Sequence, residues 1–286
     1  MTCSSTRERT AIGGKAVLSG RDIRREVLLQ SKRANVGHIG SALSVADIVA
    51  VLYAGVLSIP EPRHPDRDRF VVAKGHAALA VYAALYFRGW LTREAIDSYC
   101  ADGTHFGVHP EREIPGIDFA TGSLGHGLPL AVGAALAARL DGSSRRVFAL
   151  LSDAECNEGS VWEAAMFAAH HRLAALTAII DLNGQQALGR TADVLSLDPM
   201  DEKWRAFGWD VHVVDGHDTA ALERVLGAAP DARGRPRVVI ARTTFGKGVS
   251  YMEGQLCWHY MPMSDAEYER ALAELEAGCE EPSSAR

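Results

Sequence analysis

Short apolar runs alternate along the chain with longer stretches rich in alanine, leucine and charged residues. The apolar runs have the length of strands and fall at residues 69–73, 147–151, 176–180, 210–214 and 237–242. Between the second and third runs lies a stretch with the length and composition of a crossover helix. Strand, helix and strand in this order are typical of parallel neighbours. The pattern therefore predicts an α/β protein built on an open parallel sheet.

Helices are expected where apolar residues recur at helical spacing or where alanine dominates. In residues 16–35, Leu18 and Ile23 fall on one side, and arginine and lysine fall on the other. Ser264 and Glu267 have the spacing of a capping box, which marks the start of a last helix. The predicted helices span residues 16–35, 44–57, 77–88, 129–140, 160–173, 219–228 and 264–276.

Two of the predicted strands end next to residues with oxygen side chains. Asp153 follows the strand at 147–151, and Asn183 follows the strand at 176–180. Ligands of an open parallel sheet bind at the carboxyl ends of the strands, and hard oxygen donors suit a divalent cation that carries a diphosphate. Alternatively, Asp153 is a helix N-cap and Asn183 a turn residue. The spacing alone favours neither interpretation.

Three histidines lie in loops that could face a ligand. His38 lies between Gly37 and Gly40, His76 follows a strand and precedes a helix, and His109 stands in a turn-rich stretch. Imidazole is suited to proton exchange near neutral pH. A single loop histidine is more often merely solvated, so each of the three is only a candidate for function.

Two glycine-rich stretches could hold an anion. Glycines at 122, 125 and 127 precede the helix at 129–140, which makes a phosphate-binding loop plausible. Their spacing is not that of the dinucleotide fingerprint, and tight helix packing also selects glycine. After the last strand, Lys247 stands between two glycines, a position that suits diphosphate binding.

Composition favours small-molecule chemistry. The 286 residues carry a net charge of −6, which argues against nucleic acid as the main partner, and 47% are hydrophobic, as in ordinary globular proteins. The five cysteines are scattered and predict no disulfide framework, and no apolar run has the length of a membrane span. We expect a cytoplasmic protein with one domain over residues 1–286, a flexible start (1–14) and a frayed end (280–286).

The segment from Ala149 to Asn183 resembles the thiamine diphosphate motif of the transketolase family, which reads Gly-Asp-Gly, about thirty residues, then Asn. The likeness extends over nearly the whole chain, because the loops around His38, His76, His109 and Gly122 follow in the family's order. This sequence has Ser152 and Ala154 where the family has glycines. Alanine can still donate its N–H to a diphosphate if its φ is negative.

The resemblance implies the thiamine diphosphate-binding fold, a mostly parallel sheet with helices on both faces. It also implies thiamine diphosphate and Mg²⁺ as cofactors, with Ca²⁺ or Mn²⁺ as substitutes for the metal. The implied metal ligands are Asp153, Asn183 and the carbonyl of Gln185. The implied cofactor-binding residues are His76, Gly122, Ser123, Leu124, Gly125, Asp153, Ala154, Glu155, Asn183, Lys247 and His259.

Three residues are implied in catalysis. His38 and His109 would exchange protons with the donor and acceptor hydroxyls. Glu158 would face a glutamate of another subunit and share its proton, because two buried like charges repel.

Transketolases are usually about twice this long, and the resemblance covers only their N-terminal half. It therefore implies the N-terminal subunit of a split transketolase, joined to a C-terminal subunit in an α2β2 heterotetramer. Such an enzyme transfers a two-carbon ketol unit from a ketose, often a phosphate, to an aldose or a related acceptor. Two alternatives stay open: delivery of the unit to a carrier-protein thiol or a specialised biosynthetic acceptor, and a non-catalytic regulatory homologue.

Overall fold

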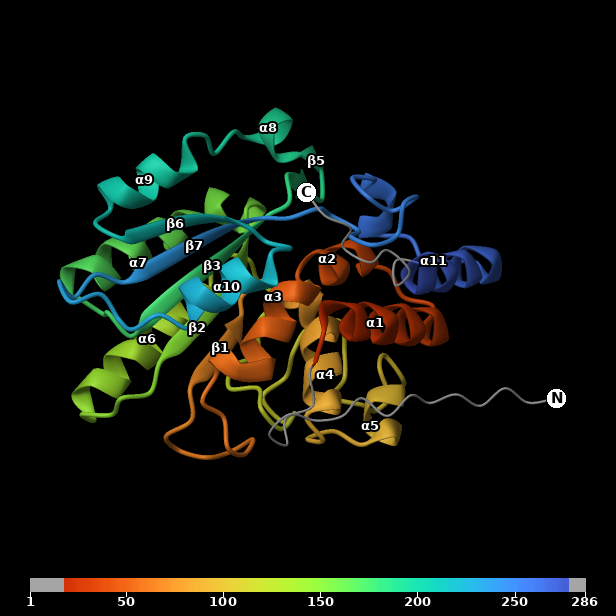
Figure 1. The fold of residues 1–286 in the computed structure, drawn as a ribbon, viewed down its shortest axis with the longest axis horizontal. Coiled ribbons are helices and arrows are strands. Elements are labelled where there is room, and N and C mark those ends of the chain that lie inside the picture. The colour runs from red at the N-terminus through yellow and green to blue at the C-terminus, as the bar shows by residue number, and fades with distance from the viewer. Residues whose placement is uncertain (1–17, 278–286) are drawn as a thin grey trace, which may run out of the picture.

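The computed structural model describes residues 18–277, which form a five-stranded parallel sheet between two layers of helices (Figure 1). The flexible start and frayed end predicted at 1–14 and 280–286 lie outside the described residues. The strand order is β1-β2-β3-β7-β6, and every neighbouring pair is parallel. The strands are β1 (Arg69–Val72), β2 (Val147–Ser152), β3 (Leu176–Leu182), β6 (Asp210–Asp215) and β7 (Arg237–Arg242). All five coincide with predicted apolar runs.

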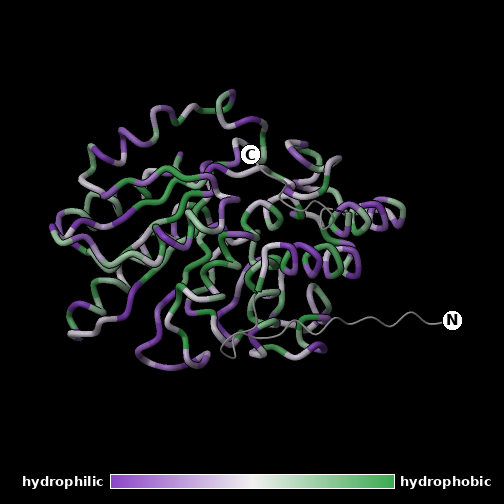
Figure 2. Tube along the Cα trace, viewed as in Figure 1, coloured by the Kyte–Doolittle hydropathy of each residue, from purple (hydrophilic) through white to green (hydrophobic). Residues whose placement is uncertain are grey.

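Alternate residues of the central strands enter two separate cores. Leu150 packs into the core formed with one helical layer, whereas Ala149 and Leu151 pack into the other. Successive strand side chains point to opposite faces, so a strand covered on both sides is apolar throughout. In Figure 2 the middle strands are coloured mostly as hydrophobic along their length.

One helical layer contains α6 and α7, and the other contains α1, α3, α4 and α10. Both faces of the sheet are therefore covered, as expected. The helices of the first layer are α6 (Gly127–Leu140) and α7 (Gly159–His170), and those of the second are α1 (Gly20–Ala34), α3 (Ala46–Val51), α4 (Ala78–Phe87) and α10 (Thr219–Leu226).

The first two helices differ from the prediction. The helix expected from residue 16 begins at Gly20, because Ser19 and Asp22 form a reciprocal capping box that fixes its start. The helix expected from residue 44 begins already at Ile39. It is divided into α2 (Ile39–Ser44), α3 and a π-helical turn (Leu52–Val56).

Several short elements were not predicted. They are α5 (Arg93–Asp97), α8 (Thr191–Val194), α9 (Met200–Ala206), the antiparallel pair β4 (Gln185–Gln186) and β5 (Gly189–Arg190), and 3₁₀ segments at Gly75–Ala77, Ala154–Asn157 and Leu256–His259. The last helix, α11 (Asp265–Ala277), begins behind the expected capping box of Ser264 and Glu267. No helix within residues 18–277 is long and apolar enough to cross a membrane.

The parallel arrangement brings the polar ends of four strands to one edge of the sheet. Lys74 follows β1, Asp153 follows β2, Asn183 follows β3, and Thr243 follows β7. Ser152 pairs in register with Asp181, so the segments carrying Asp153 and Asn183 leave the sheet side by side.

Helix α6 offers a test of how closely its start packs on the sheet. A Cβ added at Gly127 would lie 2.5 Å from the Cα of Ala73, whereas one added at Gly133 would meet no atom within 4 Å. We therefore expect Gly127→Ala to lower the free energy of unfolding by about 1–3 kcal/mol through overpacking. Gly133→Ala, in the same helix, should raise it by up to about 1 kcal/mol. Urea unfolding of both variants measures the difference, and equal effects would contradict this packing.

Candidate functional site

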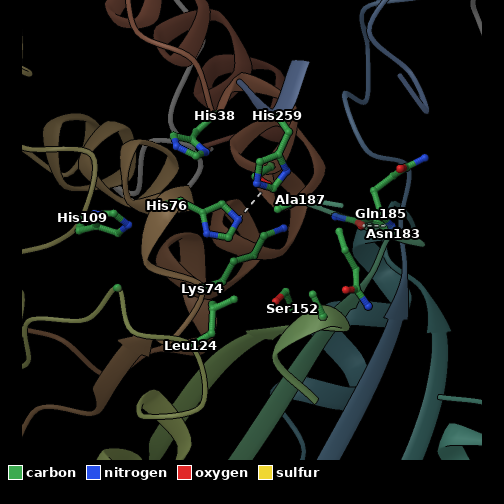
Figure 3. Close-up of a pocket in the computed structure, with 14 residues that line it drawn as sticks. His38, Lys74, His76, His109, Leu124, Ser152, Asn183, Gln185, Ala187 and His259 are labelled. Carbon is green, nitrogen blue, oxygen red and sulfur yellow. Dashed lines mark hydrogen bonds between the residues drawn. The ribbon is translucent and has the colours of Figure 1, made fainter. Parts of the chain in front are cut away.

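A cavity of about 180 Å³ opens at the carboxyl edge of β1, β2 and β3. Its wall combines residues from seven parts of the chain, with His109 at one end and Asn183 and Gln185 at the other (Figure 3). The predicted site residues that line it are His38, His76, His109, Gly122, Leu124, Ala154, Asn183, Gln185 and His259. Residues distant in sequence thus converge on one site.

Three imidazole rings form a cluster in this cavity. The ring centroids of His38, His76 and His259 are 5.3–5.5 Å apart. His76 Nε2 lies 3.1 Å from the hydroxyl of Ser41, and the buried Nδ1 atoms of His38 and His259 have no hydrogen-bond partner in the described part of the chain. Buried polar atoms are normally paired, so these two nitrogens are suited to meet a ligand.

The environment keeps the histidines neutral near pH 7. Burial lowers the pKa of His38, with a further contribution from His109, and burial also lowers the pKa of His109. Burial, together with Lys74 and the neighbouring imidazoles, holds the pKa of His76 well below 6.5. Burial, His38 and Lys74 lower the pKa of His259 to about 4. Neutral imidazoles can accept protons and hydrogen bonds, which imidazolium ions cannot.

The glycine loop at 122–127 lies so close to its neighbours that side chains would not fit. Gly122 has φ 150°, and a Cβ there would lie 3.0 Å from the ring of His109. Gly125 has φ 88°, and a Cβ there would lie 2.7 Å from the Cβ of Glu158. The loop therefore exposes backbone to the cavity at Gly122, which is the arrangement by which glycine loops bind phosphates.

Asp153 is completely buried and joins the ends of β2 and β3. Its Oδ1 accepts the N–H of Ala154 at 2.8 Å, and its Oδ2 accepts the N–H of Gly184 at 2.9 Å and the hydroxyl of Thr191 at 2.8 Å. Burial raises its pKa to about 6 despite these hydrogen bonds. Asp153 also caps the 3₁₀ segment that follows, so the capping alternative describes part of its role.

Asn183 presents its amide oxygen towards the same region. Its Nδ2 donates to Asp181 at 2.9 Å, which leaves Oδ1 as an acceptor, bonded to the N–H of Gln185 at 3.0 Å. Asp153 and Asn183 thus offer a carboxylate and an amide oxygen on adjacent turns, a donor set that fits Mg²⁺. Ala154 is not among the described residues with positive φ, and in this structure its N–H donates to Oδ1 of Asp153.

Lys74 is a site residue that the sequence did not reveal. Its side chain is 1% exposed, lines the cavity, and forms an ion pair with the fully buried Asp181. A single lysine after a strand has no periodic signal. Only its position beside Gly75 and His76, at the end of a buried strand, could have pointed to it. Other cavity residues absent from the prediction are Ser41, Ser152, Gln186 and Ala187.

Several predicted residues do not line the cavity. The carboxylate of Glu155 is buried beneath the glycine loop, where it accepts the N–H of Gly125 at 2.9 Å, and burial raises its pKa to about 7. Glu158 is exposed at the start of α7. Ser123, Gly125, Asp153, Glu155, Glu158 and Lys247 are the predicted residues outside the lining.

Lys247 faces a different groove, which it shares with Arg242 and Thr244. Its ammonium lies 3.8 Å from Glu253. The glycines on either side of it, Gly246 (φ 76°) and Gly248 (φ 92°), both have left-handed backbone.

Comparisons with known proteins identify a family and several named relatives. Residues 21–282 match the family described as transketolase, thiamine diphosphate binding domain. The chain is 40% identical over 257 residues to a 6-deoxy-6-sulfo-D-fructose transketolase subunit of Clostridium sp. (strain MSTE9), covering 89% of this chain and 94% of that protein. It is 40% identical over 245 residues to an apulose-4-phosphate transketolase subunit of Phocaeicola vulgatus, covering 85% and 87%.

Solved structures give the same result. Transketolase from Leishmania mexicana superimposes with a TM-score of 0.82 and 29% identity, covering 90% of this chain and 40% of that chain. Transketolase from Campylobacter jejuni gives 0.82 and 26%, covering 91% and 42%. The chain therefore spans less than half of these enzymes, and the expected α/β fold is confirmed. Sequence, fold and site together show that the chain belongs to the transketolase family and contains its thiamine diphosphate binding domain.

Proposed function

We propose that this chain binds thiamine diphosphate with Mg²⁺ and, with a partner subunit, transfers a two-carbon ketol unit from a ketose to an aldose or related acceptor. The observation that carries the proposal is the convergence of the histidine cluster, the glycine loop and the oxygen donors on one cavity. The family's thiamine diphosphate binding domain supports the choice of cofactor. Both named relatives act on ketoses with an anionic group, by their names, so we propose an anionic ketose as the donor.

The residues present fit the proposed cofactor and metal. Asp153, Asn183 and the carbonyl of Gln185 would hold Mg²⁺. The imidazoles of the cavity wall, two of which have an unpartnered Nδ1, and the backbone cradle at Gly122 favour an anionic, hydrogen-bonding ligand. The residues that we assign to the diphosphate are His76, Gly122, Ser123, Leu124, Gly125, Ala154 and His259. Ser123 and Gly125 are included as members of the glycine loop, although they do not line the cavity. We leave out Glu155, whose carboxylate accepts the N–H of Gly125, and Lys247, which faces another groove.

The chain's own groups would manage protons and exclude water. When bound, thiamine diphosphate supplies the stabilised carbanion needed to break and form the carbon–carbon bond. His38 and His109 would take protons from substrate hydroxyls and return them, and their lowered pKa values keep them available as bases at pH 7. The buried walls around His76 and His259 limit the access of water.

We propose that a C-terminal transketolase subunit completes the site in an α2β2 heterotetramer. The cavity of about 180 Å³ is smaller than the roughly 300–1,000 Å³ of most ligand sites. A second wall from another chain would enlarge and close it. Exposed apolar side chains near its mouth support a contact there: Leu188 is 81% exposed and Tyr260, whose hydroxyl donates to Ala187, is 53% exposed. We further propose that the chain forms one domain and is cytoplasmic, where its free thiols would stay reduced.

The metal assignment is tested at Asp153. Asp153→Asn preserves the shape but removes the carboxylate charge, so we expect Mg²⁺-dependent thiamine diphosphate affinity to fall by roughly 10- to 100-fold. Asp193→Asn, the same change at an exposed position on nearby α8, should leave the affinity unchanged. Calorimetry in the presence of the partner subunit measures both. Equal affinities for the two variants would refute the metal assignment.

The histidines should divide by role. We expect His76→Ala and His259→Ala to raise mainly the cofactor dissociation constant. His38→Ala and His109→Ala should reduce mainly turnover at saturating cofactor, by about 10²–10⁴. Because the pKa values of His38 and His109 are lowered from 6.5, wild-type turnover should be constant above that pH and fall as they gain protons at lower pH.

Steady-state kinetics over pH 5–9 separates these effects. The exposed His105, which contacts Glu111, provides the control, since His105→Ala should change neither constant. If all four cavity variants changed only cofactor affinity, the proton-transfer roles of His38 and His109 would be wrong.

The partner requirement is tested with purified subunits. We expect the isolated chain to be inactive and to bind thiamine diphosphate weakly, and the added C-terminal subunit to restore ketol transfer. Glu158→Ala should impair assembly, because this exposed carboxylate lies at the start of α7 beside the glycine loop. Glu94→Ala, an exposed change on α5, should not. Sedimentation and activity assays measure the outcome, and full activity of the isolated chain would contradict the split-subunit proposal.

A further inference from the structure

The segment that follows β7 forms the support of His259. The ring of Phe245 is 1% exposed and stacks on the ring of His259, with centroids 6.0 Å apart and planes 5° apart. On its other side Phe245 occupies the space that a side chain at Gly40 would need, and the N–H of Gly246 donates to the carbonyl of Gly40 at 3.0 Å. The position of His259 in the cavity therefore depends on where residues 243–248 lie.

Two side chains from outside this segment accept hydrogen bonds from its backbone: Glu253 bonds the N–H of Gly248 at 3.0 Å, and His217 bonds the residue before Phe245. The N–H of Thr244 donates to Nε2 of His217 at 2.9 Å. His217 lies in the turn between β6 and α10, and its side chain is 16% exposed. It is not part of the cavity wall. The residue next to Phe245 is thus fixed by an imidazole that does not line the site.

A buried carboxylate fixes the hydrogen of that imidazole. Nδ1 of His217 lies 2.8 Å from Oδ2 of Asp47. Arg24 donates one hydrogen bond to each carboxylate oxygen of Asp47. A backbone N–H can only donate, so Nε2 of His217 must accept, and the ring hydrogen must lie on Nδ1. Burial raises the pKa of Asp47, but the bonds from His217 and Arg24 outweigh it and hold that pKa below its ordinary value.

The fold makes room for this arrangement. A Cβ at Gly20 would collide with the carboxylate of Asp47, so α1 approaches α3 closely only because residue 20 is glycine. The resulting chain of contacts runs from Arg24 through Asp47 and His217 to Thr244, and it crosses from α1 and α3 to the segment behind the cavity. Arg242 and Lys247 line the same groove as His217, and the carboxylate of Asp215 accepts the backbone N–H of His217.

We infer that His217 is a positioning residue, which Asp47 holds in the Nδ1–H tautomer so that it fixes residues 243–248 and thereby seats His259 against the cofactor. The cofactor-binding role of His259 in this inference rests on the proposed function. The contacts between Asp47, His217, Thr244 and Phe245 do not depend on it. His217 touches neither the cavity nor the proposed metal ligands. Its effect passes through Thr244 and Phe245.

The first experiment measures amide hydrogen exchange of the full chain without any ligand. His217→Phe keeps a planar ring but removes the acceptor, so the amides of Thr244 and Gly246 should exchange about three- to tenfold faster, the equivalent of one net hydrogen bond. His217→Gln, whose amide oxygen can replace Nε2, should stay within about twofold of wild type. His212→Phe, the same change in the neighbouring strand where the histidine contacts Asp210, should have no effect.

The outcome is decided by the comparison of the two phenylalanine variants. If Thr244 and Gly246 exchange equally in His217→Phe and His212→Phe, the inference is wrong. Asp47→Asn gives a second test if His217→Phe does not fold. The asparagine amide can donate to Nδ1, which moves the ring hydrogen of His217 to Nε2. The N–H at Nε2 would then face the N–H of Thr244, and their hydrogen bond would be lost. Unchanged exchange in Asp47→Asn would likewise overturn the role of the carboxylate.

The second experiment measures thiamine diphosphate affinity by calorimetry in the assembled enzyme. His217→Phe should weaken binding about three- to tenfold in a wild-type background. In a His259→Ala background it should weaken binding less than about twofold, because the effects of two residues that act through one another are not additive. Equal losses in both backgrounds would overturn the inference. If wild type binds no thiamine diphosphate, the proposed function fails, whereas the exchange experiment still tests the His217 contact.

Discussion

The site depends on one buried carboxylate, that of Asp181, which ties four segments of the chain together. It receives the ammonium of Lys74 from the end of β1, the hydroxyl of Ser44 at 2.8 Å, the amide of Asn183 at 2.9 Å, and the hydroxyl of Thr243. A fully buried charge without partners is very unfavourable, whereas here each oxygen is satisfied. The loops that form the cavity are thereby fixed to the sheet edge before any ligand contributes.

The ion pair of Lys74 and Asp181 also affects the imidazole cluster. Lys74 lies close enough to lower the pKa values of His76 and His259, while its own charge is balanced by Asp181. The result is a cavity in which neutral imidazoles and backbone groups face the ligand, with the negative charge of Asp153 at one side. A phosphate-bearing ligand accompanied by a divalent cation matches that distribution of charge.

Much of the fold could be predicted from the sequence, because strands buried on both faces are continuous apolar runs whose ends are marked by polar residues. The meeting of Asp153 and Asn183 at one sheet edge, and the position of His76 after a strand, followed from the strand pattern, whereas the places of His38 and His109 were implied by the resemblance to the family. The start of α2 at Ile39 and the short helices could not be predicted, since contacts with distant segments and not local spacing decide them. Lys74 was missed for the same reason, because its partner Asp181 lies 107 residues away in sequence. Lys247 was predicted from its place between glycines after the last strand, but in the structure it lines a different groove.

The alternation of side chains in β2 has a consequence for how this protein can change. Leu150 enters one core while Ala149 and Leu151 enter the other, and Asp153 follows two residues later. Inserting or deleting one residue within the strand would exchange the two sets of side chains and move the carboxylate by about 3.3 Å along the strand. The loop at 228–236, at the opposite end of β7, has no such constraint. Changes in chain length are therefore easier to accommodate in that loop, at the amino edge of the sheet. Within a strand, the number of residues sets the distance between the core and the carboxylate at the site.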